Sequence, residues 1–369
     1  MNFCSDNVSE ICPEIMSALI AANHNTAMPY GDDEFTQTLQ AKFSTLFEKQ
    51  VIVFPVVSGS SANALALSVL TPPFGSIYCH QDAHIYLDEC GAAEFYTGGA
   101  KLIPLAGENG KITASELAIA LEKAGAGIVH HNQPASISIT QATEAGTTYK
   151  ISEIKAICEV AKKHNLKVHI DGARFANAIV NLGCTPAEMT WKIGVDVLSF
   201  GATKNGAMAA EAVIFFDQKL AETFIYRRKR AGHLLSKMRF LSVQLEAYIQ
   251  DKLWLKNADH ANKMASKLAQ GLETIPGVKI YYPVEVNEIF VQIPAIAIAG
   301  LLTEGFKFYR WPVAHNMLRL VTAFNTKEED VLKFIQVVKQ YLKVDQEAEK
   351  NITFRRKRKR NQSSVISDQ

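Results

Sequence analysis

Two charged side chains that could take part in catalysis follow two neighbouring apolar segments. Asp171 comes directly after residues 167–170 and opens the sequence Asp-Gly-Ala-Arg, which ends at Arg174. Lys204 follows residues 195–200 and has small residues on both sides. In a parallel α/β sheet, the carboxyl ends of the strands face the ligand crevice. These side chains are therefore expected to meet in one crevice.

Each of the two has a chemistry that such a position would serve. A lysine amine in an uncrowded site can form a Schiff base with a carbonyl group. An aspartate can hold a protonated pyridine nitrogen, and the cationic ring then accepts electrons from a breaking bond. Together, Lys204 and Asp171 predict a pyridoxal 5'-phosphate (PLP) cofactor. Taken singly, the lysine could equally lie in a surface loop, and the aspartate could cap a turn while Arg174 pairs at the surface.

A phosphate site and a ring-stacking side chain precede these residues in the chain. The sequence Ser-Gly-Ser-Ser at 58–61 joins an apolar segment to a helix-like one, and backbone amides at a helix N-terminus bind phosphate. Gly59 lets the backbone approach the ligand closely, and Ser60 supplies a hydroxyl donor. His84 could stack on the cofactor ring and move protons. An ordinary helix cap and a packed or solvated histidine are the competing interpretations.

The elements that must position these residues alternate between strand-like and helix-like segments. Apolar runs typical of buried strands occupy 51–57, 76–79, 101–105, 127–131 with 137–140, 167–170, 195–200 and 213–216. They predict an α/β protein with a mostly parallel seven-stranded sheet flanked by helices. Strands at 278–282, 288–293 and 318–321, with a helix at 328–342, predict a smaller α+β C-terminal domain.

This pattern divides the chain into three parts. We expect an N-terminal arm and large cofactor-binding domain at 1–250, a small domain at 251–345, and a basic disordered tail at 346–369. Formal net charge is +2, but residues 355–360 are six consecutive basic residues, so the rest carries 33 basic against 37 acidic residues. We expect no membrane partner, and no nucleic-acid partner apart from the tail. That tail is either a nuclear-localisation or nucleic-acid patch or a solubilising end.

The cysteines bear on the compartment and on metals. Six are scattered along the chain, with no CxxC pair and no metal-ligand spacing to histidines. We expect free thiols in a reducing compartment, no metal site and a cytoplasmic protein.

The order of the motifs resembles the L-threonine aldolases, in the β-eliminating lyase group of fold-type I PLP-dependent enzymes. The resemblance runs over about residues 3–342. Four further elements carry it: Ser5-Asp6-Asn7, Tyr30-Gly31-Asp32-Asp33, Asp88-Glu89-Cys90-Gly91-Ala92 and Leu318-Arg319-Leu320-Val321-Thr322. It implies a PLP-dependent transferase-like fold. It also implies cleavage of L-threonine, L-allo-threonine or related β-hydroxy-α-amino acids, such as phenylserine, to glycine and an aldehyde.

The resemblance also implies a role for each site residue. Lys204 would form the Schiff base, Asp171 would hold the pyridinium, and His84 would stack on the ring. Phosphate would be bound by Gly59 and Ser60, the cofactor site would include Arg174, and the substrate would be contacted by Ser5, Tyr30, Arg174 and Arg319. His84 is the first candidate for the base that takes the β-hydroxyl proton. The second is Glu144, which stands where better-known bacterial members carry a histidine.

Assembly is a further implication of the resemblance. It implies a homodimer or homotetramer with active sites at the subunit interface. Residues 227–237 resemble the family region that supplies phosphate contacts from a neighbouring subunit, with Arg230 or Lys237 as the contact.

Two other functions remain compatible with the sequence. One is a different reaction of a fold-type I PLP enzyme of amino-acid metabolism: β-elimination, racemisation or transamination. The other is a member without activity that binds a partner, for instance through the basic tail. The intact set of Lys204, Asp171 and Arg174 argues against the second, since a site that had lost its function would be expected to lose at least one of them.

Overall fold

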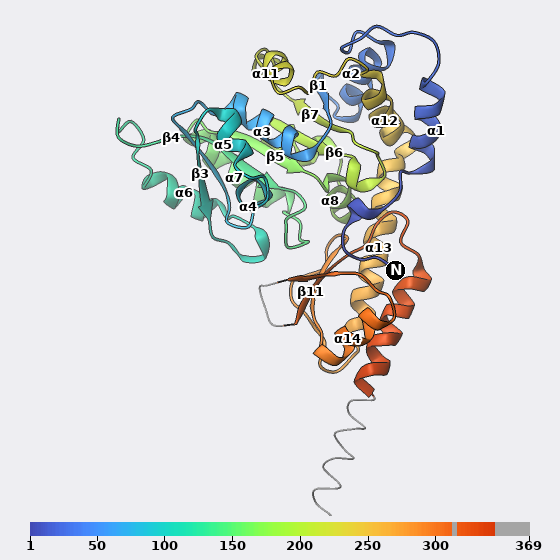
Figure 1. Cartoon of the computed structure of the whole chain (residues 1–369). Helices are drawn as coiled ribbons and strands as arrows, with labels where there is room; N and C mark the ends of the chain where they lie inside the picture. The colour runs from blue at the N-terminus through green and yellow to red at the C-terminus, as the bar shows by residue number, and fades with distance from the viewer. Residues whose placement is uncertain (312–315, 344–369) are drawn as a thin grey trace, which may run out of the picture.

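The chain folds into two lobes that a long helix joins. A computed structural model describes residues 1–311 and 316–343. The larger lobe holds a seven-stranded sheet, and the smaller holds a four-stranded sheet with α14 beside it (Figure 1). Helix α13 (Leu253–Glu273) runs from one lobe into the other (Figure 1).

The large sheet is mostly parallel. Its strands are β1 (Ile52–Val56), β2 (Gly75–His80), β3 (Lys101–Leu105), β4 (Gln133–Thr140), β5 (Lys167–Gly172), β6 (Val197–Gly201) and β7 (Glu211–Phe215), in the order β1-β7-β6-β5-β4-β2-β3. β7 runs antiparallel to both of its neighbours, β1 and β6, and the other neighbouring strands pair in parallel. The predicted fold class is confirmed.

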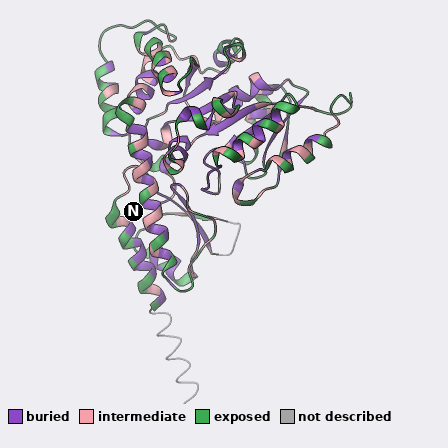
Figure 2. Cartoon of the chain, turned by 180° about the vertical axis from the view of Figure 1, so that it is seen from behind, coloured by how far each residue is buried: buried purple, intermediate pink, exposed green. Residues whose placement is uncertain are grey.

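Helices cover both faces of this sheet. They are α1 (Pro13–Ala22), α2 (Glu34–Leu46), α3 (Gly59–Leu70), α4 (His84–Leu87), α5 (Ala92–Thr97), α6 (Ala114–Glu122), α7 (Ile151–Lys163), α8 (Phe175–Leu182), α9 (Pro186–Met189), α10 (Gln218–Ala221), α11 (Phe224–Arg230) and α12 (Arg239–Ile249). Side chains alternate along a strand. Leu198 and Ile214 therefore pack with α2, α7, α8 and α12, whereas Val197 and Val213 pack with α3 and α11. The central strands β6 and β7 are buried along their whole length, and β5 is buried after Lys167 (Figure 2).

The small lobe is built on an antiparallel sheet. Its strands are β8 (Lys279–Ile280), β9 (Glu288–Gln292), β10 (Tyr309–Trp311) and β11 (Met317–Val321), in the order β10-β11-β9-β8. Helix α14 (Ala295–Thr303) and the helical residues 328–343 pack with it. Phe3 of the N-terminal arm is buried in the same core.

The division near residue 250 stays a proposal. It falls between α12 and α13, and α13 contributes to both cores. Trp254 and Ala258, near its start, lie in the core of the large lobe, while Ala265 and Leu268 lie in that of the small lobe. The two lobes therefore share one helix.

One strand prediction is wrong. Residues 127–131 form turns, and β4 begins only at Gln133. Gly127 has φ +83°, and the side chain of Val129 is 92% exposed. The β-branched pair Ile128-Val129 suggested a strand, but it lies at the tip of a turn. The predicted tail at 346–369 lies outside the described residues. Within the described part of the chain, no helix combines the length and apolarity needed to cross a membrane.

Candidate active site

Most of the residues predicted for the site line one cavity of about 280 Å³. It lies where the carboxyl ends of β5 and β6 meet the N-terminus of α3. The predicted residues in its wall are Gly59, Ser60, His84, Glu144, Asp171, Arg174 and Lys204. The chain order that suggested the site thus corresponds to one place in the fold.

The start of α3 leaves room for a ligand. Ser58 caps this helix, because its Oγ accepts a hydrogen bond from the Ser61 amide at 3.3 Å. The first amides of a helix have no partner within the helix, so those of Gly59 and Ser60 remain for a ligand. A Cβ added at Gly59 would meet no atom within 4 Å, so space is open beside this backbone. The local geometry fits an anion such as a phosphate group.

Lys204 is carried by a firmly held turn. It is the middle residue of the 3-10 turn Thr203–Asn205 that follows β6. The Asn205 side chain donates 2.8 Å hydrogen bonds to the Tyr248 hydroxyl and to the Trp254 carbonyl oxygen. Gly206 closes the turn with φ +116°, which favours glycine. The lysine backbone is therefore fixed by both α12 and α13.

Asp171 belongs to a buried network that sequence reasoning did not find. Asn63, on α3, donates through Nδ2 to Asp171 Oδ2 at 2.8 Å and to Glu89 Oε1 at 2.9 Å. Asp171 Oδ1 accepts from the Ala173 amide at 3.0 Å. These contacts fix both carboxylate oxygens of Asp171 in the cavity wall.

The same network reaches His84. His84 Nδ1 lies 2.9 Å from Glu89 Oε1. Its hydrogen bond to Glu89 raises the pKa of His84 despite partial burial. Burial raises the pKa of Glu89. One carboxylate thus orients the imidazole and, through Asn63, links it to Asp171.

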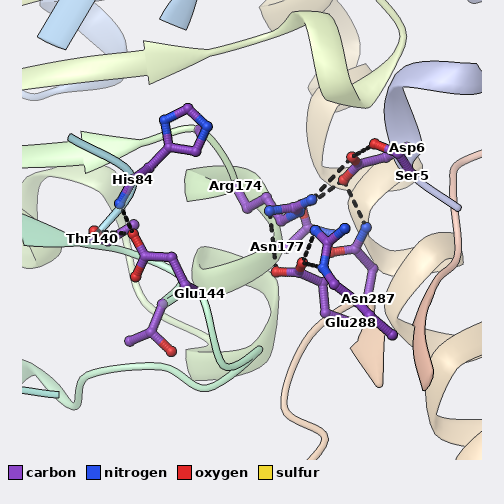
Figure 3. A network of polar contacts seen from close by, with 12 residues as sticks. Ser5, Asp6, His84, Thr140, Glu144, Arg174, Asn177, Asn287 and Glu288 are labelled. Carbon is purple, nitrogen blue, oxygen red and sulfur yellow. Dashed lines mark hydrogen bonds and ion pairs between the residues drawn. The ribbon is translucent and has the colours of Figure 1, made fainter. Parts of the chain in front are cut away.

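Glu144 presents one free oxygen to the cavity. Its Oε1 accepts 2.8 Å hydrogen bonds from the His84 amide and from the Thr140 hydroxyl (Figure 3). Its Oε2 is buried and has no hydrogen-bond partner among the residues that the structure describes. Burial raises the pKa of Glu144 to about 7. A carboxyl group of this kind can accept or release a proton near neutral pH.

A second cavity of about 410 Å³ shares part of its wall with the first. His84, Glu144, Arg174 and Lys204 line both cavities. The second adds two of the predicted substrate contacts, Ser5 and Arg319, and three aromatic side chains, Tyr282, Phe290 and Trp311. It therefore offers cationic groups and an apolar wall beside Lys204.

The two arginines are held by buried carboxylates, and Figure 3 shows Arg174 with Asp6 and Glu288. Arg174 donates to Asp6 through Nε at 2.8 Å and Nη2 at 3.0 Å, and its Nη1 lies 3.1 Å from Glu288. Arg319 donates through Nε to the other oxygen of Glu288 at 3.1 Å. Asn287 donates to Asp6 at 3.0 Å. Burial raises the pKa of Asp6, but Arg174 and Lys204 outweigh it and leave that pKa below its ordinary value.

Some predicted residues lie apart from these cavities. Tyr30 lines neither cavity, is 47% exposed, and has the Lys229 ammonium 4.7 Å from its ring centroid. Arg230 and Lys237 are exposed and line neither cavity. Their roles in the site stay predictions.

Four site residues were missed from the sequence: Asn63, Glu89, Glu211 and Glu288. Each is polar and lies within or beside an apolar segment, and Glu89 also belongs to the stretch at 88–92 that carries the family resemblance. Their partners come from distant parts of the chain, so spacing could not identify them.

An aspartate and a lysine on adjacent strand ends, opposite a helix N-terminus, place the protein in the fold-type I class of α/β proteins. Mouse CSAD has the same fold, with a TM-score of 0.72 at 14% identity, covering 92% of this chain and 83% of that one. At this identity the likeness shows the fold alone.

The chain belongs to the β-eliminating lyase family, whose model matches residues 2–295. It is 45% identical over 330 residues to a low specificity L-threonine aldolase of Pseudomonas sp. (strain NCIMB 10558), covering 89% of this chain and 94% of that one. It also resembles the structure of Leishmania major threonine aldolase, with a TM-score of 0.86, 28% identity, and coverage of 92% and 98%. The expected resemblance to the L-threonine aldolases is confirmed.

Proposed function

We propose that this protein is a PLP-dependent aldolase. It cleaves L-threonine, L-allo-threonine and related β-hydroxy-α-amino acids, such as phenylserine, to glycine and an aldehyde. One observation carries the proposal: Lys204, Asp171 and His84 line one cavity at the start of α3, and Arg174 and Arg319 line the cavity beside it. The Pseudomonas and Leishmania major relatives are both threonine aldolases by name, which supports the proposal.

The residues present fit the cofactor. The open backbone at Gly59 and Ser60 would bind the phosphate. Asp171 would pair with the pyridine nitrogen, His84 would stack on the ring, and Lys204 would hold the cofactor through its amine. When bound, PLP withdraws electrons from a bond at Cα of the amino acid. The buried Asn63 Oδ1 and Glu144 Oε2 lack hydrogen-bond partners among the described residues, as expected of a wall built for a polar ligand.

The arginine cluster would bind the substrate carboxylate. Arg174 and Arg319 carry two positive charges, and Glu288 and Asp6 fix their positions. Because the carboxylates hold the guanidinium groups in place, little side-chain entropy is lost when substrate binds. Ser5 lines the same cavity and adds a hydroxyl. Fixing the carboxylate here would orient the substrate in the cavity that Lys204 and Glu144 also line.

Glu144 is the better candidate for the proton acceptor. The hydrogen bond to Glu89 favours the protonated form of His84, since it raises the pKa of that imidazole. Glu144 has an oxygen without a partner among the described residues, and burial raises its pKa to about 7. Its carboxylate would take the β-hydroxyl proton as the Cα–Cβ bond breaks, which leaves an aldehyde at Cβ. Return of a proton to Cα then yields glycine.

The reaction assay separates this function from its alternatives. Purified protein with added PLP should release glycine and acetaldehyde in equal amounts from L-threonine. Release of pyruvate and ammonia from serine, with no glycine from threonine, would indicate a β-eliminating enzyme. Change of configuration without cleavage would indicate a racemase, and a new 2-oxo acid would indicate an aminotransferase.

Assembly as a homodimer or homotetramer is part of this proposal. Met16, Ile20 and Met208 are exposed apolar side chains that line a cavity together with Val57, which also lines the first site cavity. An apolar surface so close to the site supports a subunit boundary there. Size-exclusion chromatography with light scattering should give two or four times the monomer mass, which is 40.7 kDa. The monomer mass would contradict it.

A further inference from the structure

Glu211 is a buried carboxylate in the wall of the first cavity, and it has no role in the proposed cleavage reaction. It is the first residue of β7 and pairs with Gly201 of β6, directly before the turn that carries Lys204. It is 6% exposed and lines the same cavity as Lys204. Burying a carboxylate costs free energy, so we expect this one to have a role beside the lysine.

The hydrogen bonds of Glu211 stabilise the turn that carries Lys204. Oε2 accepts from the Ala202 amide at 2.7 Å, and both the side chain and the backbone of Thr203 also donate to this carboxylate. The Thr203 hydroxyl in turn accepts from the Ala210 amide at 3.2 Å. Glu211 thus fixes the two residues that precede Lys204.

Its charge also acts on Lys204. Burial raises the pKa of Glu211 to about 7, although the hydrogen bonds from Thr203 and Ala202 and the charge of Lys204 oppose that rise. At about pH 8 the group is therefore mostly ionised. Glu211 has no ion-pair partner within 4 Å among residues 1–311 and 316–343. Its negative charge remains to act on the lysine.

Other titratable groups near Lys204 have hydrogen-bond or ion-pair partners of their own. Asp6 is paired with Arg174, and His84 is hydrogen-bonded to Glu89. Asp171 is held by Asn63 and Ala173, and the lining residue Glu144 is held by Thr140 and His84. Asp171, Glu144 and Glu211 thus have hydrogen bonds but no ion pair among the described residues, and Glu211 is the one that holds the residues directly before Lys204.

We propose that Glu211 is the positioning residue of Lys204: it fixes the turn at 202–204, and its negative charge stabilises the protonated form of the nitrogen that links Lys204 to the cofactor. This inference rests on the proposed function, because it requires PLP on Lys204. It assigns Glu211 an electrostatic role that a purely structural carboxylate would not have.

The test is a pH titration of the visible absorbance of the PLP-loaded protein. Glu211→Gln keeps the shape and the acceptor oxygen but removes the charge. The pH at the midpoint of the absorbance change should therefore fall by about one unit or more, because a close opposite charge shifts a pKa by about that much. Glu211→Asp keeps a charge at greater distance, and its midpoint should lie between those of the wild type and Glu211→Gln. Glu285→Gln is the matched control. Glu285 also holds a backbone amide and a threonine hydroxyl, those of Thr148 at 2.6 and 3.0 Å, but lines neither cavity.

The outcomes separate this inference from the proposed function. A wild type without a visible band would overturn the proposed function itself. A wild-type band with the same midpoint in Glu211→Gln would overturn the inference about Glu211 alone. A shift of equal size in Glu285→Gln would also overturn it. If circular dichroism shows that Glu211→Gln does not fold, an unshifted midpoint in Glu211→Asp decides against the inference.

Discussion

Replacing Glu144 with glutamine removes the proposed proton acceptor and keeps the shape of the side chain. Burial raises the pKa of Glu144 to about 7 from an ordinary value of 4.5. Each unit of pKa corresponds to about 1.4 kcal/mol, so ionising this group in its buried place costs about 3 kcal/mol. The substitution should therefore change both the reaction and the pH dependence of stability.

The reaction gives the first readout. With L-threonine, wild-type kcat/KM should rise about tenfold per pH unit below pH 7 and level off above it, because only the ionised carboxylate accepts a proton. Glu144→Gln should lower kcat by about 10²- to 10⁴-fold and abolish this acid limb. Its KM should change little, since the arginine cluster is untouched.

Stability gives a second readout that does not depend on turnover. The pKa of Glu144 is higher in the folded state, so its contribution is fully present below pH 4.5 and is lost as pH rises through 7. Relative to Glu144→Gln, the wild type should therefore lose about 3 kcal/mol of unfolding free energy between these two pH values. Denaturant titrations at a series of pH values measure the difference.

An exposed glutamate supplies the control for Glu144→Gln. Glu159→Gln changes an exposed glutamate on α7 and should leave both readouts as in the wild type. If Glu144→Gln kept the wild-type kcat and acid limb, Glu144 would not be the base. His84 would then be the next residue to test.

Two further predictions concern the stability of the framework. Glu288→Ala should lower the free energy of unfolding by about 3–5 kcal/mol, because it removes the carboxylate of Arg319 and leaves Asp6 as the one carboxylate beside two arginines; denaturant unfolding measures this. Glu304→Ala, in an exposed pair with Lys333, should cost less than about 1 kcal/mol, and equal losses would contradict the account. Gly201→Ala should lower Tm, since the added Cβ would lie 2.6 Å from a backbone oxygen. Gly59→Ala is the control, because its added Cβ would have no atom within 4 Å, and its Tm should equal that of the wild type. A wild-type Tm in Gly201→Ala would show that the close contact at Gly201 does not limit stability.

The fold could be predicted from the sequence because its main signal is local. Short apolar runs marked the strands of the large sheet, and segments of helical spacing between them implied parallel pairing. The error at 127–131 came from the same signal, since β-branched residues at an exposed turn have the composition of a strand. In that segment the positive φ of Gly127 decided the structure.

The site could be predicted in part for a related reason. Asp171 and Lys204 follow their strands directly, so the strand-end rule located both. Glu211 and Glu288 reach the site through strand pairing and through the packing of the small lobe on the large one, which no local spacing records. The prediction therefore included the groups that would hold the cofactor but missed the carboxylates that position the lysine and the arginines.

Chemical trapping of the cofactor tests the central claim most directly. The protein is loaded with PLP, reduced with borohydride, digested and mapped by mass spectrometry, with Lys204→Ala as the control. The account predicts a reduced cofactor adduct on Lys204, and loss of both the adduct and the activity in the control. An adduct on another lysine, or an unmodified Lys204 in protein that cleaves threonine, would contradict it.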